Sequence, residues 1–114
     1  MKKIYLASPY SHPDPKVREE RARLACVAAA EIMRSGHLVL SPIAHSHPIA
    51  LAGNLPLDFE YWREFDESLI DWCDQVWVLM IDGWMDSKGI KAEVEYAEKT
   101  DKFVYHYRMT TCEM

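Results

Sequence analysis

The sequence contains few cysteines, and they are not arranged in pairs. Its three cysteines, Cys26, Cys73 and Cys112, are odd in number and widely spaced, and no C-x-x-C motif is present. A zinc ribbon or a thioredoxin-type redox site is therefore not encoded. Unpaired thiols are typical of a reducing compartment, so we expect a cytoplasmic protein with free cysteines.

Long hydrophobic runs are absent as well. No stretch of about 18 apolar residues occurs, which predicts no transmembrane helix. The apolar run in residues 1–10 (MKKIYLASPY) is too short for a secretory signal peptide. The formal net charge is -5, which argues against a nucleic-acid backbone or an anionic membrane as the main partner. A small anionic ligand held by local donors is still compatible with this charge.

The composition is that of a single globular domain. Of the 114 residues, 49% are apolar and 27% are charged, which is ordinary for a folded domain. A chain of this length buries a core without needing disulfides or a structural metal. We therefore predict one domain over residues 1–114.

Short apolar strands alternate with helical segments along the chain. The first helix has a clear start at Asp14-Pro15, an N-cap followed by proline, and a stop at Gly36. The segment 43–56 is rich in His, Pro and Gly and is expected to be a loop. We expect strands at residues 3–7, 37–41, 75–80 and 103–107, and helices at residues 15–35, at 58–73 and from residue 89 onward.

This order of elements predicts an α/β fold. Strands that alternate with helices form right-handed βαβ crossovers, and these give a parallel sheet. We expect a small doubly wound sheet, Rossmann-like or flavodoxin-like, of four to five strands with helices on both faces. Ligands of such sheets bind beyond the carboxyl ends of the strands, which here are residues 8–13, 42–47 and 81–88.

Two carboxylates occupy positions that the helical pattern assigns to the apolar face. Glu93 falls within the stripe of Ile90, Val94 and Ala97, and Asp66 lies on the same face as Trp62 and Ile70 in the preceding helix. An unpaired carboxylate is costly to bury, so such residues are hydrogen-bonded, protonated or exposed to a cavity. The alternative is that each lies at the edge of its stripe and reaches solvent.

A pair of carboxyl groups in different environments is what the cleavage of a glycosidic bond requires. One group acts as nucleophile or stabilises the cation, and the other supplies or accepts a proton. In a retaining reaction the two groups lie about 5 Å apart. Because Asp66 and Glu93 lie on consecutive helices that flank one strand, they can meet over its end.

Residues 89–97 (GIKAEVEYA) resemble the Gly-x-x-x-Glu-Leu-Gly-Tyr-Ala signature of the nucleoside 2-deoxyribosyltransferase family, which is related to the deoxynucleoside monophosphate N-glycosidases. The opening IYLASPY and the segment 66–74 resemble two further parts of that family, so the resemblance covers nearly the whole chain. It implies that Glu93 attacks the sugar C1′, that Tyr5 positions Glu93, and that Asp66 contacts the sugar and the base. It also implies chemistry without metal or cofactor, and a dimer or larger assembly.

The departures from the family pattern bear on the reaction. Glu95 stands where the signature has glycine, and the further acid of the transferases is represented here by Asp86, shifted by one residue. Ser87 at the matching place resembles the monophosphate glycosidases, where a serine helps to bind the phosphate. The long C-terminal part through which transferase subunits complete one another's sites has no counterpart after residue 107. These features favour hydrolysis over transfer between bases.

The other site candidates lie on the predicted loops, and each has a structural alternative. Tyr10 and Trp84 suit stacking on a base but also suit a lid or an interface. Ser87 suits an anion at a helix N-terminus or a simple helix cap, and Arg21 suits a phosphate or solvent. The candidate substrate-binding residues are Ser8, Tyr10, Ser11, His45, Trp84, Asp86, Ser87 and Gly89.

His45 and His47 are two residues apart and would share a face of an extended segment, as metal ligands do. No carboxylate or cysteine nearby completes a ligand set, so we predict no metal site. One of the two histidines contacting substrate, or acting as proton donor, is the better interpretation.

The sequence thus predicts an N-glycosidase that acts on a small-molecule (deoxy)nucleoside or its 5′-monophosphate. Glu93, Asp66 and Tyr5 are the predicted catalytic residues. A deoxyribosyltransferase and a non-catalytic nucleotide-binding module are the alternatives, the latter with Glu93 as an internal hydrogen-bond partner of Tyr5. Four tryptophans and an apolar helix face favour a homo-oligomer.

Overall fold

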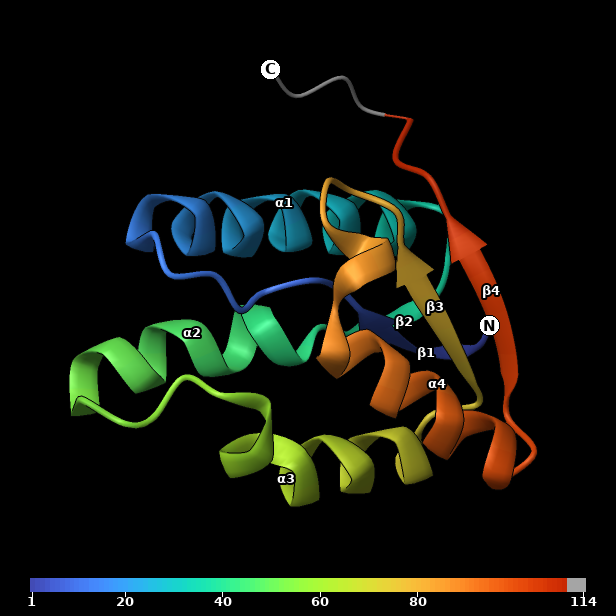
Figure 1. Cartoon of the computed structure of the whole chain (residues 1–114). Coiled ribbons are helices and arrows are strands. Elements are labelled where there is room, and N and C mark those ends of the chain that lie inside the picture. The colour runs from blue at the N-terminus through green and yellow to red at the C-terminus, as the bar shows by residue number, and fades with distance from the viewer. Residues whose placement is uncertain (111–114) are drawn as a thin grey trace.

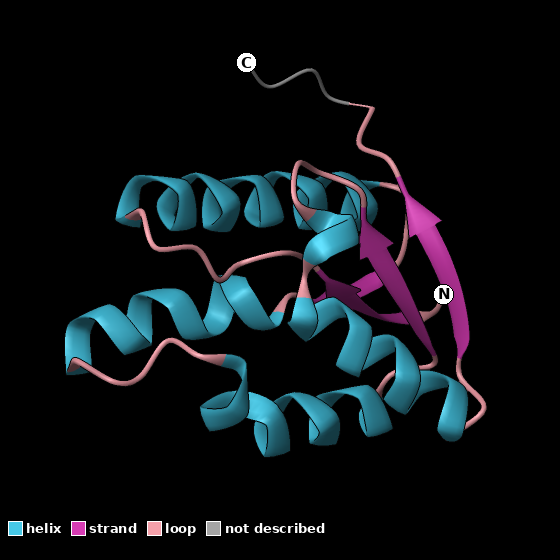
Figure 2. Cartoon of the chain, in the orientation of Figure 1, coloured by secondary structure: helices cyan, strands magenta, loops and turns pink. Residues whose placement is uncertain are grey.

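A computed structural model describes residues 1–110 and contains one parallel sheet flanked by helices (Figure 1). In these residues the four strands lie in the order β2-β1-β3-β4, and every neighbouring pair is parallel. Strands and helices alternate along the chain (Figure 2). The elements are β1 (Lys3–Ala7), α1 (Pro15–Arg34), β2 (Leu38–Leu40), α2 (Pro42–Gly53), α3 (Phe59–Trp72), β3 (Gln75–Leu79), a short 3₁₀ helix (Trp84–Asp86), α4 (Lys88–Lys99) and β4 (Phe103–Tyr107).

The strand order confirms the predicted doubly wound α/β fold. The chain moves from β1 to β2 on one side, then crosses back past β1 to form β3 and β4 on the other side. Right-handed crossovers in opposite directions place their helices on opposite faces. α1 therefore lies on one face, and α3 and α4 lie on the other.

Two apolar clusters join the helices to the two faces of the sheet. On the α1 face, Ile4 and Leu6 of β1 pack with Ile32 of α1. On the other face, Tyr5 and Ala7 pack in the same cluster as residues of α3 and α4. The alternation of residues 4 to 7 between the two clusters is the period of a strand buried on both sides. It also directs the Tyr5 ring towards α3 and α4.

The first helix begins and ends as the sequence predicts. Asp14 is the N-cap of α1, with its side chain accepting the Lys16 amide at 2.9 Å, and Pro15 occupies the first turn. Ser35 is the C-cap, and Gly36 follows with a φ of 103°. A residue with a side chain is strained at that φ, which explains why the helix stops before a glycine.

The prediction of a loop over residues 43–56 is wrong, because most of this segment forms α2. Ser41 caps this helix by accepting the Ala44 amide at 3.1 Å, and Pro42 sits in the first turn, where a missing N–H costs nothing. The helix ends at Asn54, which adopts the left-handed conformation with a φ of 54°. Pro48 lies inside the helix, which is why the composition of the segment is misleading.

The helical form of this segment also removes the basis for a shared face of His45 and His47. Residues two apart in a helix do not face the same side. His45 is exposed and stacks on Phe65, with ring centroids 5.2 Å apart, whereas His47 points towards Tyr10. Within residues 1–110, no group of three or more His, Cys, Asp or Glu side chains is placed to hold a metal ion.

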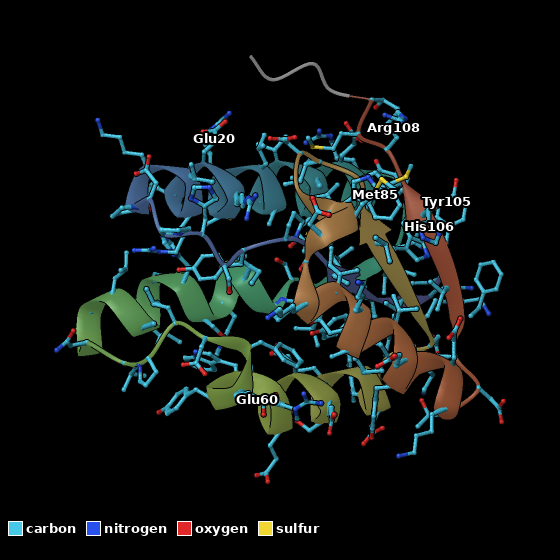
Figure 3. The ribbon with its side chains drawn as sticks, in the orientation of Figure 1. Glu20, Glu60, Met85, Tyr105, His106 and Arg108 are labelled. Atoms are coloured by element: carbon cyan, nitrogen blue, oxygen red, sulfur yellow. The ribbon has the colours of Figure 1, made fainter. Side chains whose placement is uncertain are left out.

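The α1 face of the sheet is partly uncovered at β4. Phe103 and Tyr105 are 60% and 46% exposed, and Tyr105 lies on the outer strand in Figure 3. Trp77 of β3 contacts Tyr105 with ring centroids 4.9 Å apart. α1 reaches β4 at the carboxyl end of that strand, where the Tyr107 hydroxyl donates to Glu31, and this leaves the aromatic residues at the start and middle of β4 exposed.

Two further expectations concern the state of the cysteines and the length of the helices. Cys26 and Cys73 are free thiols, the former exposed and the latter buried. Cys112 lies outside the described residues. Among the helices of residues 1–110, none has the length and apolar character needed to span a membrane.

Candidate active site

A cavity of about 730 Å³ opens at the carboxyl ends of β1 and β3. Its walls come from the loops that follow these two strands and from α2, α3 and the start of α4. β1 and β3 are neighbours in the sheet, but the chain leaves them in opposite directions. A crevice forms at such a reversal, and it is where doubly wound sheets bind their ligands. The volume is in the range of small-molecule sites.

Asp66 and Glu93 both line this cavity, and both are buried. Each residue is 5% exposed, which rules out the alternative that they reach solvent at the edge of a stripe. The fully buried Tyr5 donates its hydroxyl to Glu93 Oε2. The same hydroxyl also interacts with Asp66. The two carboxyl groups, predicted to meet over the end of a strand, therefore meet at Tyr5.

Burial dominates the protonation of this pair. It raises the pKa of Asp66 to about 7, against a smaller opposing effect of Tyr5. Burial also raises the pKa of Glu93 well above its usual range; the Tyr5 hydrogen bond lowers it, and the charge of Asp66 raises it further. Two interacting carboxyls in such a site do not both ionise at neutral pH. The pair therefore holds at least one proton.

Unsatisfied polar atoms gather around the same cavity. Within residues 1–110, three buried side-chain atoms lack a hydrogen-bond partner: Ser8 Oγ, Ser46 Oγ and Asp66 Oδ1. All three residues line the cavity. Buried polar groups are nearly always paired in native proteins. Their concentration here indicates that a polar ligand or ordered water completes them.

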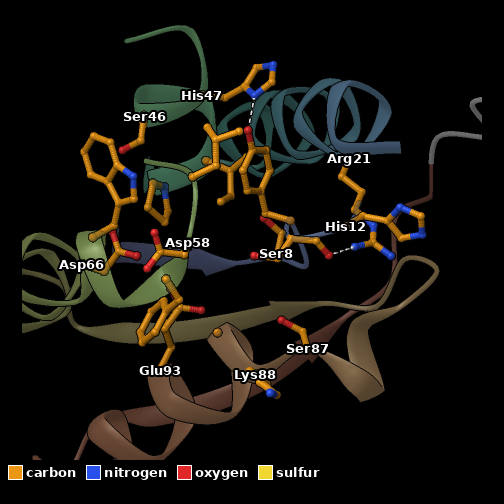
Figure 4. A pocket seen from close by; sticks show the side chains of 18 of the residues that line it. Ser8, His12, Arg21, Ser46, His47, Asp58, Asp66, Ser87, Lys88 and Glu93 are labelled. Atoms are coloured by element: carbon orange, nitrogen blue, oxygen red, sulfur yellow. Dashed lines mark hydrogen bonds between the residues drawn. The ribbon is translucent and has the colours of Figure 1, made fainter. Parts of the chain in front are cut away.

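The opposite end of the cavity is basic and lies against the start of α4. Figure 4 shows Asp66 and Glu93 on one side of the pocket and Arg21, His12 and Ser87 on the other. Ser87 is the N-cap of α4 and accepts the Ile90 amide at 3.1 Å, as the simpler interpretation of this residue predicts. It also lines the cavity. A helix start with free N–H groups favours an anion at this end.

Arg21 joins the two loops that flank this basic end. Its Nη1 donates to the Ser11 carbonyl at 2.9 Å, and its guanidinium lies against Gly83. A Cβ at position 83 would overlap the guanidinium, and Gly83 has a φ of 92°. Both facts require glycine there. These contacts hold the Arg21 side chain against the two loops. The side chain is half-buried and does not extend into solvent.

Most of the predicted site residues come together, and two do not. Ser8, Tyr10, Ser11, Asp86, Ser87 and Gly89 line the cavity with Asp66 and Glu93. His45 is outside it, because its position on α2 turns it towards Phe65. Trp84 is also outside it, because its ring packs on the core and lies 5.4 Å from the His106 ring.

Sequence reasoning missed Ser46 of α2 and the start of α3, and it named His45 rather than His47 as the substrate-binding residue of the histidine pair. Ser46 and His47 reach the cavity from α2, and Trp62 and Phe59 form part of its wall from α3. A helix over residues 42–53 would have identified Ser46, since it lies one turn after Pro42 and one turn before Ala50, both buried. Ser41-Pro42, an N-cap followed by proline, is the sequence signal that predicts this helix, and the His, Pro and Gly composition of the segment obscures it.

The fold and the site together define an α/β domain with a ligand pocket at its topological reversal and a buried pair of carboxyl groups inside that pocket. The chain belongs to the family described as a domain of unknown function (DUF1937), whose model matches residues 2–109. Comparison with curated proteins gives no match.

The raised pKa of Asp66 predicts that this residue destabilises the folded protein at high pH. The folded-state pKa is about 7, whereas the ordinary value of 3.8 applies to the unfolded chain. Below 3.8 the carboxyl is neutral in both states; between the two values only the unfolded state is charged, and above 7 the folded state carries a buried charge. The free-energy cost of Asp66 to the folded state therefore grows as pH rises from about 4 to about 7.

Asp66→Asn, which never ionises, should raise the free energy of unfolding at pH 8 by roughly 2–4 kcal/mol. Urea denaturation at several pH values measures the difference in unfolding free energy between Asp66→Asn and the wild type. This difference should shrink towards pH 4. Asp82→Asn at an exposed position is the matched control and should show no such trend. An Asp66→Asn gap that is the same at pH 4 and pH 8 would contradict the assigned protonation.

The contact between Arg21 and Gly83 predicts a non-additive pair of substitutions. Gly83→Ala strains the backbone and displaces Arg21, whereas Gly36→Ala, with a φ of 103° and nothing within 4 Å, only strains the backbone. Strain of this kind costs about 1–2 kcal/mol. Gly83→Ala should cost more than Gly36→Ala in the wild type and about the same in an Arg21→Ala background. A urea-denaturation double-mutant cycle measures this coupling, and additive effects would disprove the contact.

Proposed function

We propose that the protein is an N-glycosidase that cleaves the base–sugar bond of a (deoxy)nucleoside or its 5′-monophosphate. The observation that supports this most is the buried carboxyl pair, Asp66 and Glu93, which lies beside the Tyr5 hydroxyl inside an accessible cavity. Glycosidic-bond cleavage uses two carboxyl groups with different protonation states. The resemblance of residues 89–97 to the nucleoside 2-deoxyribosyltransferase signature assigns the nucleophile to the same glutamate.

In the proposed reaction Glu93 acts as the carboxylate. Its oxygen attacks C1′ while the bond between C1′ and the base nitrogen breaks, and the electron pair of that bond leaves with the base. The hydrogen bond from Tyr5 stabilises the charge on Glu93 and fixes its position. The reacting state is the one in which Asp66 holds the proton of the pair and donates a hydrogen bond to a sugar hydroxyl, so that Glu93 carries the single charge; the burial that raises the pKa of Glu93 opposes this state. Water then releases the sugar from Glu93.

The two ends of the cavity suit the two ends of a nucleotide. Arg21, Ser87 and the first N–H groups of α4 offer donors to a 5′-phosphate, and the unpaired Ser8 Oγ adds a further polar contact. At the end that holds the carboxyl pair, Trp62 of α3 provides aromatic surface for a base, whereas Phe59 lies against Gly89 at the start of α4. This order puts the sugar between the phosphate and the base, beside the carboxyl pair.

A second candidate function is binding without turnover, and the protonation of Glu93 favours it. Burial raises the pKa of Glu93 well above its usual range, and a neutral carboxyl is no nucleophile. In that case the pocket would hold a nucleotide as a signal, with Glu93 as a hydrogen-bond partner of Tyr5 and of the ligand. Base transfer is a third possibility and differs from hydrolysis only in its acceptor.

A homo-oligomer in a reducing, cytoplasmic compartment is the setting we propose. Cys26 is a free and exposed thiol, which suits reducing conditions. The exposed aromatic residues Phe103 and Tyr105 give the uncovered sheet face an apolar character that suits self-association.

The glycosidase hypothesis predicts release of free base. The pure protein is incubated with ribo- and deoxyribonucleosides and their 5′-monophosphates, and the products are separated by chromatography. Glu93→Gln should lower the rate by about 10³-fold or more, because the amide is no nucleophile. Glu95→Gln, an exposed glutamate on the same helix, should keep the wild-type rate.

The other functions give different results in the same assay. Exchange of the base when a second free base is added would identify a transferase. Binding of a nucleotide by calorimetry, with no base released from any panel member and with similar affinity in Glu93→Gln, would replace the enzyme by the binding module.

A further inference from the structure

A chain of hydrogen bonds that the two carboxyl groups do not use leads out of the cavity. The Tyr10 hydroxyl, on the loop after β1, lies 2.6 Å from His47 Nδ1 on α2. His47 Nε2 lies 2.6 Å from Glu19 Oε2 on α1. Tyr10 and His47 line the cavity, and the His47 side chain is only 10% exposed. Glu19 is 67% exposed, so the chain connects the cavity with solvent.

The protonation of His47 decides what Tyr10 offers to a ligand. When His47 is neutral, its Nε2–H donates to Glu19 and its Nδ1 accepts the Tyr10 hydrogen, so the Tyr10 oxygen presents lone pairs. When His47 is an imidazolium, Nδ1–H donates to Tyr10, and the Tyr10 hydrogen is free to point into the cavity. The Glu19 carboxylate contacts the histidine from the far side, as the aspartate of a Ser-His-Asp triad does.

Few other charges act on this chain. Burial raises the pKa of Tyr10 above its usual value, while Arg18 lowers it and Glu19 raises it. Arg18 is also bound to the His12 carbonyl, which holds the same loop. On the outer side of His47, Glu20 and Arg23 pair with each other at 2.8 Å. Glu19 is therefore the charged group in contact with His47, and Tyr10 stays protonated near neutral pH.

We propose that Tyr10, His47 and Glu19 form the proton relay of the glycosidase, with Tyr10 as the acid that protonates the departing base. This inference rests on the proposed function. Tyr10 is the catalytic residue of the three, because it faces the substrate; His47 and Glu19 are positioning residues that act through it.

The relay balances over the two halves of the reaction. As the bond from C1′ to the base breaks, Tyr10 gives its proton to the base, and the Nδ1 proton of the imidazolium moves to Tyr10. Water then attacks C1′ and displaces Glu93. Tyr10 accepts the proton of that water and passes its own to Nδ1, which restores the imidazolium. The net change is one water consumed and one base released.

Asp66 is less suited to this task. Its carboxyl is buried beside Tyr5, and within the described residues its Oδ1 has no hydrogen-bond partner with which to exchange a proton. Tyr10 has such a partner in His47, which supplies the proton that replaces the one given to the base and takes one back after water attacks.

The test compares two leaving groups. The first substrate is the panel member that releases base fastest, and the second is the 4-nitrophenyl glycoside of the same sugar, whose leaving group departs without a proton. Tyr10→Phe should lower kcat for base release by about 10²-fold or more and change 4-nitrophenol release less than about threefold. His47→Gln and Glu19→Gln should give the same selective loss with smaller size. His45→Gln, an exposed histidine on the same helix, is the matched control and should not change either rate.

Each other outcome overturns a defined part of the inference. Equal loss of both rates in Tyr10→Phe and in Glu19→Gln would mean that the chain only shapes the pocket, and unchanged rates would mean that it has no role. Because Glu19 is exposed, Glu19→Gln tests the relay even if Tyr10→Phe perturbs the loop. If the wild type cleaves neither substrate, the glycosidase function fails and the relay fails with it. Cleavage of the 4-nitrophenyl glycoside that disappears in Glu93→Gln would keep the function and leave the relay to be decided by the variants.

Discussion

The organisation of the pocket depends on one interaction, in which a buried tyrosine hydroxyl donates to one of two neighbouring buried carboxyl groups. Tyr5 is fully buried in the first strand, so its hydroxyl has no water to bond to and is fixed by the strand itself. Two helices from later in the sequence bring Asp66 and Glu93 to that hydroxyl. Burying these acids costs free energy. Burial of the apolar residues around them, such as Ile70 on α3 and Ile90 on α4, offsets this cost. The site is therefore inseparable from the core on this face.

The winding of the sheet explains why the cavity forms where it does. If the chain continued from β1 to β3 on one side of the sheet, the loops after these strands would run in the same direction and cover their ends. The chain instead reverses after β2, so the loops leave β1 and β3 in opposite directions. α2, inserted between β2 and α3, then forms an additional wall from which Ser46 and His47 reach the cavity.

Much of the fold and the centre of the site could be predicted from the sequence, because their signals are local. The strands are short apolar runs, Asp14-Pro15 and Gly36 bound the first helix, and Asp66 and Glu93 stand out as charges in apolar stripes. α2 could not be recognised from composition, since its His, Pro and Gly content is that of a loop and its stabilising features, the Ser41 cap and the proline in the first turn, are only two residues. That one error hid Ser46, misplaced His45 and suggested a shared face for two histidines. The contact of Tyr10 with His47 and of Arg21 with Gly83 depends on the distances between elements, which no local pattern encodes.

The two sets of ionisable groups in the pocket solve different physical problems. The pair beside Tyr5 is almost fully buried in the cavity wall, so its charge is strong and well positioned but is costly to create, as the raised pKa of Asp66 indicates. The Tyr10–His47–Glu19 chain ends at the exposed Glu19 carboxylate, so a charge at that end costs little, and its histidine has a hydrogen-bond partner on each ring nitrogen, as a proton relay requires. Cleavage of a glycosidic bond needs both: a confined negative charge beside the developing cation and a proton source that is renewed in each cycle. A pocket that only binds a nucleotide has no use for a renewable proton. The coexistence of both features on opposite walls of one cavity is thus a stronger reason to expect catalysis than either feature alone.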